Sequence, residues 1–154
     1  MNKHARAKTL LTLRKLLCRP YVRDAQRILT KARQEGSSTL AQRQIDFLQL
    51  PIEDGGVATD HAMHRLAEDC CQRILNGERL YIHCWGGHGR TGTLVSILLG
   101  RLYGMDARAA LRYCQKCHDS RRYPQDTMSP QTPAQRAQVR AHGQSCSACR
   151  VWRV

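Results

Sequence analysis

The chemistry of this chain is concentrated in ten consecutive residues, His83-Cys84-Trp85-Gly86-Gly87-His88-Gly89-Arg90-Thr91-Gly92. Four of these ten residues are glycines, so the backbone can fold into a cup whose N–H groups point inward and bind an anion. Cys84 lies at the mouth of this cup, where inward N–H dipoles, a helix N-terminus and a nearby guanidinium favour the thiolate. The segment is therefore predicted to be a phosphate-binding loop that carries its own nucleophile.

Each side chain of the loop has an expected part in this chemistry. The Cys84 thiolate is the predicted nucleophile, and the planar guanidinium of Arg90 can bind two equatorial oxygens of a phosphoryl group. The Thr91 hydroxyl can hydrogen-bond the sulfur, and a protonated His88 would add positive charge. No metal and no cofactor are expected, since Arg90 and the loop supply the charge. The predicted phosphate-binding residues are Trp85, Gly86, Gly87, His88, Gly89 and Arg90.

The residues on either side of the loop predict the elements that position it. Leu80, Tyr81 and Ile82 form a short apolar run typical of a strand, and residues 94–102 have the apolar spacing of a helix. The loop therefore joins a strand to a helix, whose N-terminus adds about half a positive charge to the anion site. His83 is expected to be a hydrogen-bonding partner that fixes the loop.

Other glycine-rich loops fit this segment less well. Gly87, Gly89 and Gly92 also spell G-x-G-x-x-G, with Asp106 at the distance of a dinucleotide-binding acid, but the helix leaves no room for the second strand. A nucleotide P-loop needs Gly-Lys before its hydroxyl residue, and this chain has Arg90 there. A rhodanese-like sulfur carrier needs no upstream acid. A glycine-rich turn with an incidental cysteine is the remaining alternative.

The loop resembles the Cys, five residues, Arg, Thr signature of the cysteine-dependent protein tyrosine phosphatases, and the chain length is similar to their small dual-specificity branch. This resemblance implies a phosphocysteine intermediate and a general acid on an upstream loop. The acid is supplied by the segment Pro51-Ile52-Glu53-Asp54-Gly55-Gly56. The sequence of this segment is most similar to that of phosphatases of the kinase-associated kind. Ser129-Pro130-Gln131-Thr132-Pro133-Ala134-Gln135 is similar to the segment that closes many of these domains. The resemblance covers roughly residues 45–140.

Three acidic residues compete for the role of general acid. Asp54 precedes two glycines that can act as a hinge, which suits a carboxyl on a loop that closes over substrate. Asp60 stands where a helix cap belongs, and Glu53 should point the opposite way in an extended segment. Asp54 is therefore the predicted acid, and a turn-capping role is its alternative.

The predicted fold class is α/β: a single domain with a central, mostly parallel sheet flanked by helices. The N-terminal part of the sheet is expected to be reduced or replaced, because the only clear early strand is residues 45–50. The expected organisation is a basic helical N-terminal segment (1–40), a catalytic domain (41–142) and a C-terminal tail (143–154). Further helices are predicted over residues 23–34, 60–76 and 106–118 and from residue 132.

Leucines interleaved with basic residues predict an amphipathic helix that ends before Pro20. This helix is expected to pack loosely on the domain, with a mitochondrial transit segment or a lipid-docking surface as alternatives. The formal net charge of +13 favours anionic partners, above all a phosphorylated protein, with polyanions and anionic lipid as further contacts. No obligate nucleic acid is expected. No apolar run reaches the length of a membrane span.

The chain has eight cysteines, but a reactive thiolate argues for a reducing compartment, so a cytoplasmic location is expected, with a nuclear one as an alternative. Cys114, Cys117, Cys146 and Cys149 have zinc-like spacing, yet the first pair falls within a helix without the turn that presents such ligands. Rival functions are a phosphoinositide or RNA 5′-phosphatase and a catalytically weak phosphate-binding module. Lipid-directed relatives typically carry lysines where this loop has Trp85 and His88.

Overall fold

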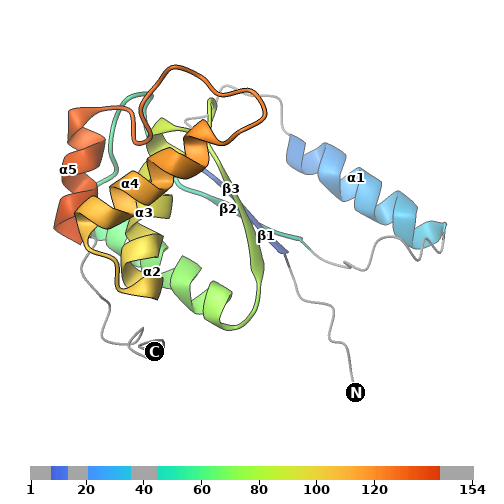
Figure 1. Ribbon diagram of the computed structural model, residues 1–154. Helices are drawn as coiled ribbons and strands as arrows, with labels where there is room; N and C mark the ends of the chain where they lie inside the picture. Colours follow the sequence, from blue (N-terminus) through green and yellow to red (C-terminus); the bar gives the residue numbers. More distant parts are fainter. Residues whose placement is uncertain (1–7, 14–20, 36–44, 143–154) are drawn as a thin grey trace.

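The computed structural model describes residues 8–13, 21–35 and 45–142. They form a three-stranded parallel sheet and five helices, an α/β architecture (Figure 1). The strands and helices, in chain order, are β1 Lys8–Thr12, α1 Tyr21–Gln34, β2 Ile45–Gln49, α2 Asp60–Leu75, β3 Arg79–His83, α3 Gly89–Tyr103, α4 Ala107–Asp119 and α5 Pro133–His142.

The sheet has the strand order β2-β1-β3, so the first strand of the described chain lies in the middle. Leu11 of β1 is opposite Leu48 of β2 and Ile82 of β3. Because side chains alternate along a strand, these three residues share one face of the sheet. That face is the core face, since Leu11 is fully buried and Leu48 and Ile82 pack against the core.

Helices α2 to α5 gather on the core face of the sheet, as Figure 1 shows. Helix α3 is central to this layer, because it contacts α2, α4, α5 and β3 and twelve of its fifteen residues are buried. Cys70 of α2 lies in the same core, where burial raises the pKa of its thiol to about 12. This cysteine is therefore a packing residue rather than a reactive one.

Helix α1 lies on the opposite face of the sheet (Figure 1). Its partly buried residues Val22, Ala25, Leu29 and Ala32 recur at helical spacing. Leu29 and neighbouring α1 residues line a shallow pocket together with Ile45 and Phe47, which alternate with the core-facing residues of β2. The helix predicted over residues 23–34 is thus confirmed.

The helix predicted before Pro20 is wrong for residues 8–12, which form β1. Thr9, Leu11 and Leu13 are all fully buried, an alternation of period two that fits a strand. Leucines and basic residues also fit a helical repeat, and only pairing with two neighbouring strands decides between the two. The segment expected to be helical over residues 1–40 therefore contains a strand and a helix in its described part. Residues 1–7 and 14–19 of the predicted helix lie outside the described residues.

The remaining elements agree with the sequence, including the reduced sheet of three strands among the described residues. Asp106 caps α4 by accepting a hydrogen bond of 2.7 Å from the N–H of Ala109. The predicted cap of α2 is wrong by one residue: the hydroxyl of Thr59 accepts from the N–H of Ala62, while Asp60 is the first helical residue. No helix in the described ranges combines the length and the apolarity needed to cross a membrane.

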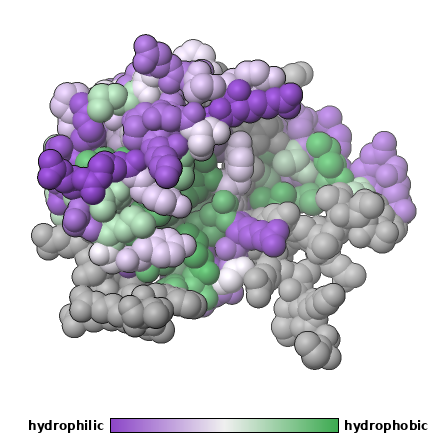
Figure 2. Space-filling model, in the orientation of Figure 1, coloured by the Kyte–Doolittle hydropathy of each residue, from purple (hydrophilic) through white to green (hydrophobic). Residues whose placement is uncertain are grey.

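The parallel strands end at one edge, where the chain turns into its functional loops. Leu13 and Leu50 continue β1 and β2 with backbone hydrogen bonds to His83 and Thr12, and Cys84 follows β3 directly. Figure 2 shows hydrophilic side chains gathered at the top of this view, over the loop that joins α4 to α5. This edge of a parallel sheet is where α/β proteins bind ligands.

Candidate active site

The nucleophile loop, residues 84–88, runs from the end of β3 to the start of α3. At its beginning, Nδ1 of His83 lies 2.9 Å from the Cys84 carbonyl oxygen, which confirms the predicted contact of this histidine with the loop. Gly87 has a φ of +72°, a left-handed conformation that glycine adopts without strain. The backbone thus turns sharply and delivers the helix N-terminus beside Cys84.

The environment of Cys84 favours its thiolate. Burial by itself raises the pKa of this thiol, but hydrogen bonds from the Thr91 hydroxyl and from the N–H groups of Thr91 and Gly87 lower it, and so does the charge of Arg90. The lowering contributions prevail, so the pKa of Cys84 lies below its ordinary value. The Thr91 hydroxyl is buried and has no conventional acceptor within the described residues, which leaves its proton available to the sulfur.

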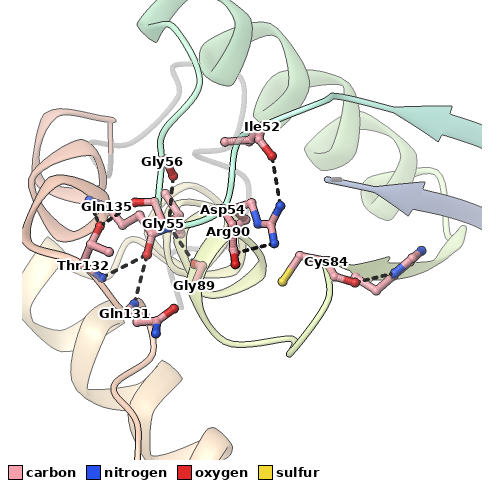
Figure 3. A network of polar contacts seen from close by, with 12 residues as sticks. Ile52, Asp54, Gly55, Gly56, Cys84, Gly89, Arg90, Gln131, Thr132 and Gln135 are labelled. Carbon is pink, nitrogen blue, oxygen red and sulfur yellow. Dashed lines mark hydrogen bonds and ion pairs between the residues drawn. The ribbon is translucent and has the colours of Figure 1, made fainter. Parts of the chain in front are cut away.

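Arg90 is buried, with 6% of its side chain exposed, and holds two partners. One guanidinium nitrogen, Nη1, donates to the Ile52 carbonyl oxygen over 2.9 Å, and the other, Nη2, donates to the Asp54 carboxylate over 2.7 Å. Figure 3 shows the Cys84 sulfur on the side of its loop that faces this pair. The three predicted catalytic groups, Cys84, Arg90 and Asp54, are therefore brought together from two loops.

The two loops are joined through the start of α5, as Figure 3 shows. The Thr132 hydroxyl donates to the Gly55 carbonyl over 3.1 Å, and the Gln135 amide donates to the Gly56 carbonyl over 3.0 Å. Gln135 is almost fully buried, and its amide lies close enough to Gly89 that a Cβ there would be 3.1 Å away. The Gln135 side chain thus lies between the loop that carries Asp54 and the nucleophile loop.

The competing acids take part in other contacts. Glu53 turns the chain, since its carbonyl accepts the Gly56 N–H over 3.1 Å. Asp60 belongs to the first turn of α2 and contacts Gln138 and His142 of α5. Asp54 remains the carboxyl at Arg90, with 72% of its side chain exposed.

His88 differs from the expectation that it adds charge to the phosphate site. Burial first, and then the charges of His118 and Arg121, lower the pKa of His88, so its ring is neutral at pH 7. The ring lies against Gly86, where an added Cβ would clash with it. Trp85 is 74% exposed beside the nucleophile.

Residues from the segment between α4 and α5 support the loop. Ser129 begins the segment that resembles the closing part of these phosphatase domains, whereas the sequence predicts no role for Arg121. Arg121 donates to the carbonyls of Gly86 and Gly87, and the Ser129 hydroxyl donates to the carbonyl of His88. An isolated arginine in a loop carries no sequence signal for such a contact. Within the described ranges no group of three or more His, Cys, Asp or Glu side chains could hold a metal ion. Cys146 and Cys149 lie outside those ranges.

A parallel sheet whose last strand ends in a Cys-x5-Arg-Thr loop, with a carboxylate delivered from a second loop, defines the class of cysteine-dependent phosphatases. Residues 4–148 match the family model PTP-SAK, the Swiss Army Knife protein, DSP-PTPase phosphatase domain. The chain therefore belongs to this family of tyrosine and dual-specificity phosphatase domains. The family match agrees with the resemblance stated from the loop, while the narrower kinase-associated likeness stays a prediction.

Curated relatives match over shorter stretches. MJECL20, an uncharacterized protein of Methanocaldococcus jannaschii, is 35% identical over 74 residues, which cover 48% of this chain and 48% of that protein. The 067L protein of Invertebrate iridescent virus 3, whose name proposes a tyrosine phosphatase, is 26% identical over 80 residues, 49% of this chain and 33% of that protein. The chain thus spans about half or less of the length of these relatives.

Solved structures share the fold. Tk-PTP in its active form is 21% identical, with a TM-score of 0.62 over 88% of this chain and 78% of that chain. TpbA of P. aeruginosa is 19% identical, with a TM-score of 0.51 over 89% of this chain and 66% of that chain. At these identities the likeness establishes the architecture alone.

Proposed function

We propose that this chain hydrolyses phosphate monoesters on proteins through a phosphocysteine intermediate, with Cys84 as nucleophile, Arg90 as phosphate ligand and Asp54 as general acid. The observation that carries the proposal is the Arg90–Asp54 pair beside Cys84. Arg90 is buried and fixed, whereas the carboxylate bound to it is mostly exposed and lies next to Gly55, which has a φ of +71°. Such a carboxylate can exchange its place with a phosphoryl group.

Substrate binding begins with this exchange. Equatorial phosphoryl oxygens take the place of the Asp54 carboxylate at Nη2 of Arg90 and accept hydrogen bonds from the loop N–H groups. The hydrogen bond from Nη1 to the Ile52 carbonyl keeps the guanidinium plane in position during the exchange. Asp54 is then released beside the leaving oxygen, where its carboxylate takes up a proton from solvent and can donate it.

The chemistry follows in two displacements. The Cys84 thiolate attacks phosphorus in line, an S–P bond forms, the P–O bond to the substrate breaks, and Asp54 gives its proton to the departing oxygen. Water then attacks the phosphocysteine, Asp54 accepts its proton, and the S–P bond breaks to return the thiolate. The Thr91 hydroxyl stabilises the sulfur when it leaves, which is the step in which its negative charge develops.

Phosphotyrosine, phosphoserine and phosphothreonine all remain within the proposed substrate class. The exposed indole of Trp85 supplies an apolar surface beside the nucleophile, and the basic chain favours acidic phosphopeptides. The expected location, a reducing compartment of the cytoplasm or nucleus, is part of the same proposal, because a low-pKa thiol is easily oxidised.

Turnover of an aryl phosphate and of a phosphotyrosine peptide tests the proposal. Cys84→Ser should abolish turnover while inorganic phosphate still binds, because the weaker hydroxyl nucleophile leaves the N–H cup intact. Cys117→Ser is the matched control, since this thiol is exposed on α4 and should leave the rate unchanged. An unaltered rate for Cys84→Ser would exclude the mechanism. Phosphate binding without turnover in the parent protein would instead support a phosphate-binding module.

A further inference from the structure

The orientation of three successive peptide groups decides whether the nucleophile loop can bind an anion. In a planar trans peptide the C=O and the N–H point in opposite directions. The Gly87 N–H is directed at the Cys84 sulfur and lowers the pKa of its thiol, so the carbonyl of Gly86, in the same peptide unit, points away from the cup. By the same geometry, an outward carbonyl of Gly87 turns the N–H of His88 inward.

Arg121 holds both of these carbonyls from outside the cup. Its Nη2 donates to the Gly87 carbonyl over 2.6 Å, and its Nη1 reaches the Gly86 carbonyl at 3.5 Å. Gly87 has no other donor to its carbonyl within the part of the chain that the structure describes. The peptide group between His88 and Gly89 is also held from outside the cup, because the Ser129 hydroxyl donates to the His88 carbonyl over 3.0 Å.

The backbone at Gly86 and Gly87 is not restricted to one conformation by its own residues. Gly86 and Gly87 carry no side chains, and glycine allows peptide orientations that other residues resist. A rotated peptide would present its carbonyl oxygen to the thiolate and to the phosphoryl oxygens, and like charges would repel. A guanidinium on the outer face opposes that rotation, because two of its N–H groups would lose their acceptors.

We propose that Arg121 is a positioning residue that keeps the N–H groups of Gly87 and His88 directed into the anion site. It acts through the loop backbone and does not contact substrate. The inference rests on the proposed use of this loop as a phosphate site. It assigns the segment between α4 and α5 a part in catalysis: this segment sets the geometry of a nucleophile that lies more than thirty residues earlier in the chain.

Three variants test the inference. Arg121→Met keeps the length of the side chain without donors, Arg121→Lys restores one donor, and Arg122→Met is the matched control. Arg122 is the neighbouring exposed arginine, and its guanidinium lies over the Tyr123 ring, 5.5 Å from the centroid. The control removes the same charge from the same loop without touching the nucleophile loop.

Two measurements are needed that do not depend on turnover. The first is the rate of Cys84 alkylation by iodoacetamide against pH, and the second is protection of Cys84 from alkylation by inorganic phosphate. Arg121→Met should move the alkylation profile about one pH unit to the alkaline side and weaken phosphate protection about tenfold. Arg121→Lys should recover part of both effects, and Arg122→Met should match the parent.

An Arg121→Met protein with the alkylation profile and phosphate protection of the parent would overturn the inference, and so would equal effects from Arg122→Met. The melting temperature of each variant shows whether the protein is folded, which is expected for an exposed residue. If the parent protein lacks turnover but Arg121→Met still weakens phosphate protection, the proposed function fails and the inference stands. If the parent turns over substrate and Arg121→Met does so equally, the inference alone fails.

Discussion

Two arginines organise the two ends of the sheet, and they are used in opposite ways. Arg73 of α2 lies at the amino ends of the strands and Arg90 of α3 at their carboxyl ends. Nη1 of Arg73 contacts the Thr9 hydroxyl at 3.1 Å and two carboxylates at 3.2 Å, while Nε contacts Asp69 at 2.9 Å. Arg90 has one carbonyl and one exposed carboxylate.

The difference lies in how firmly the partners are held. The acids around Arg73 come from β2, from α2 and from the turn before β3, and together they raise the pKa of its guanidinium further. Three carboxylates from three different segments already surround this guanidinium. The single carboxylate at Arg90 sits on a loop with a glycine hinge and can leave. An exchangeable partner, more than burial, distinguishes Arg90, the arginine proposed to bind substrate, from Arg73.

Replacing each arginine by lysine should show the difference between Arg73 and Arg90 most clearly. Arg90→Lys keeps the charge but loses the planar fork, so kcat/KM should fall by about a hundredfold or more. Arg73→Lys, the matched control, should leave kcat/KM of the folded protein unchanged. Steady-state kinetics on an aryl phosphate decide the matter. Near-normal kinetics for Arg90→Lys would show that the loop does not use bidentate recognition.

Asp54→Asn tests the exchange at Arg90. The rate on a substrate with a poor leaving group should fall by about two orders of magnitude, with a smaller loss when the leaving group needs no proton. The same variant should bind inorganic phosphate more tightly, because the anion no longer displaces a carboxylate from Arg90. Asp60→Asn is the control, since Asp60 pairs with His142 away from the site. Equal losses on both substrates would move the acid role away from Asp54.

Thr91→Val should have a smaller effect that is visible in the pH profile. Hydrogen bonds from Thr91 are among the contributions that lower the pKa of Cys84, so removing the hydroxyl raises that pKa. Activity of a thiolate nucleophile rises with pH through this pKa, and the acidic limb of kcat/KM should therefore shift to higher pH. The rate at neutral pH should fall about tenfold. An unchanged limb, measured from pH 5 to 8, would contradict the role of the hydroxyl.

Arg73→Met completes the comparison with an effect on stability alone. It leaves three carboxylates without their shared cation, and the free energy of unfolding should fall by about 1–2 kcal/mol because the cluster is only partly buried. Urea denaturation measures the loss. The kcat/KM of the folded fraction should equal that of the parent, and a large fall would show that the two ends of the sheet are coupled.

The meeting of Cys84, Arg90 and Thr91 in space was predictable from the sequence because these residues are close in the chain. Cys84, Arg90 and Thr91 lie within eight consecutive residues, and the glycines among them prescribe the turn that brings them together. Asp54 could be selected only with the additional argument that the two glycines after it can act as a hinge, because a single acidic residue forms no sequence pattern. The supporting contacts of Arg121, Ser129 and Gln135 could not be predicted, because they join segments distant in the chain through single side chains.

The fold was predictable where amphipathic helices carry caps or glycine stops, as α2 and α4 do. It was not predictable at β1, where a short run of leucines and basic residues fits two periodicities. Burial of Thr9 and Leu11 between β2 and β3 decides for the strand, and this information is tertiary. The error at Asp60 has a simpler cause: Thr59 and Asp60 are both good capping residues, and the hydroxyl prevails.

The central position of β1 in the sheet sets the order in which the strands can pair while the chain is being synthesised. A ribosome makes β1 before β2 and β3, so this strand gains its two neighbours only when β2 and then β3 have emerged. Pairing over such separations is slow, because large loops must close before any contact is gained. Among the described residues the last strand of the sheet ends at His83, one residue before Cys84. During synthesis Cys84 therefore lacks the hydrogen bonds from Thr91 and Gly87 and the charge of Arg90, and its thiolate is favoured only once the fold brings these groups to the sulfur.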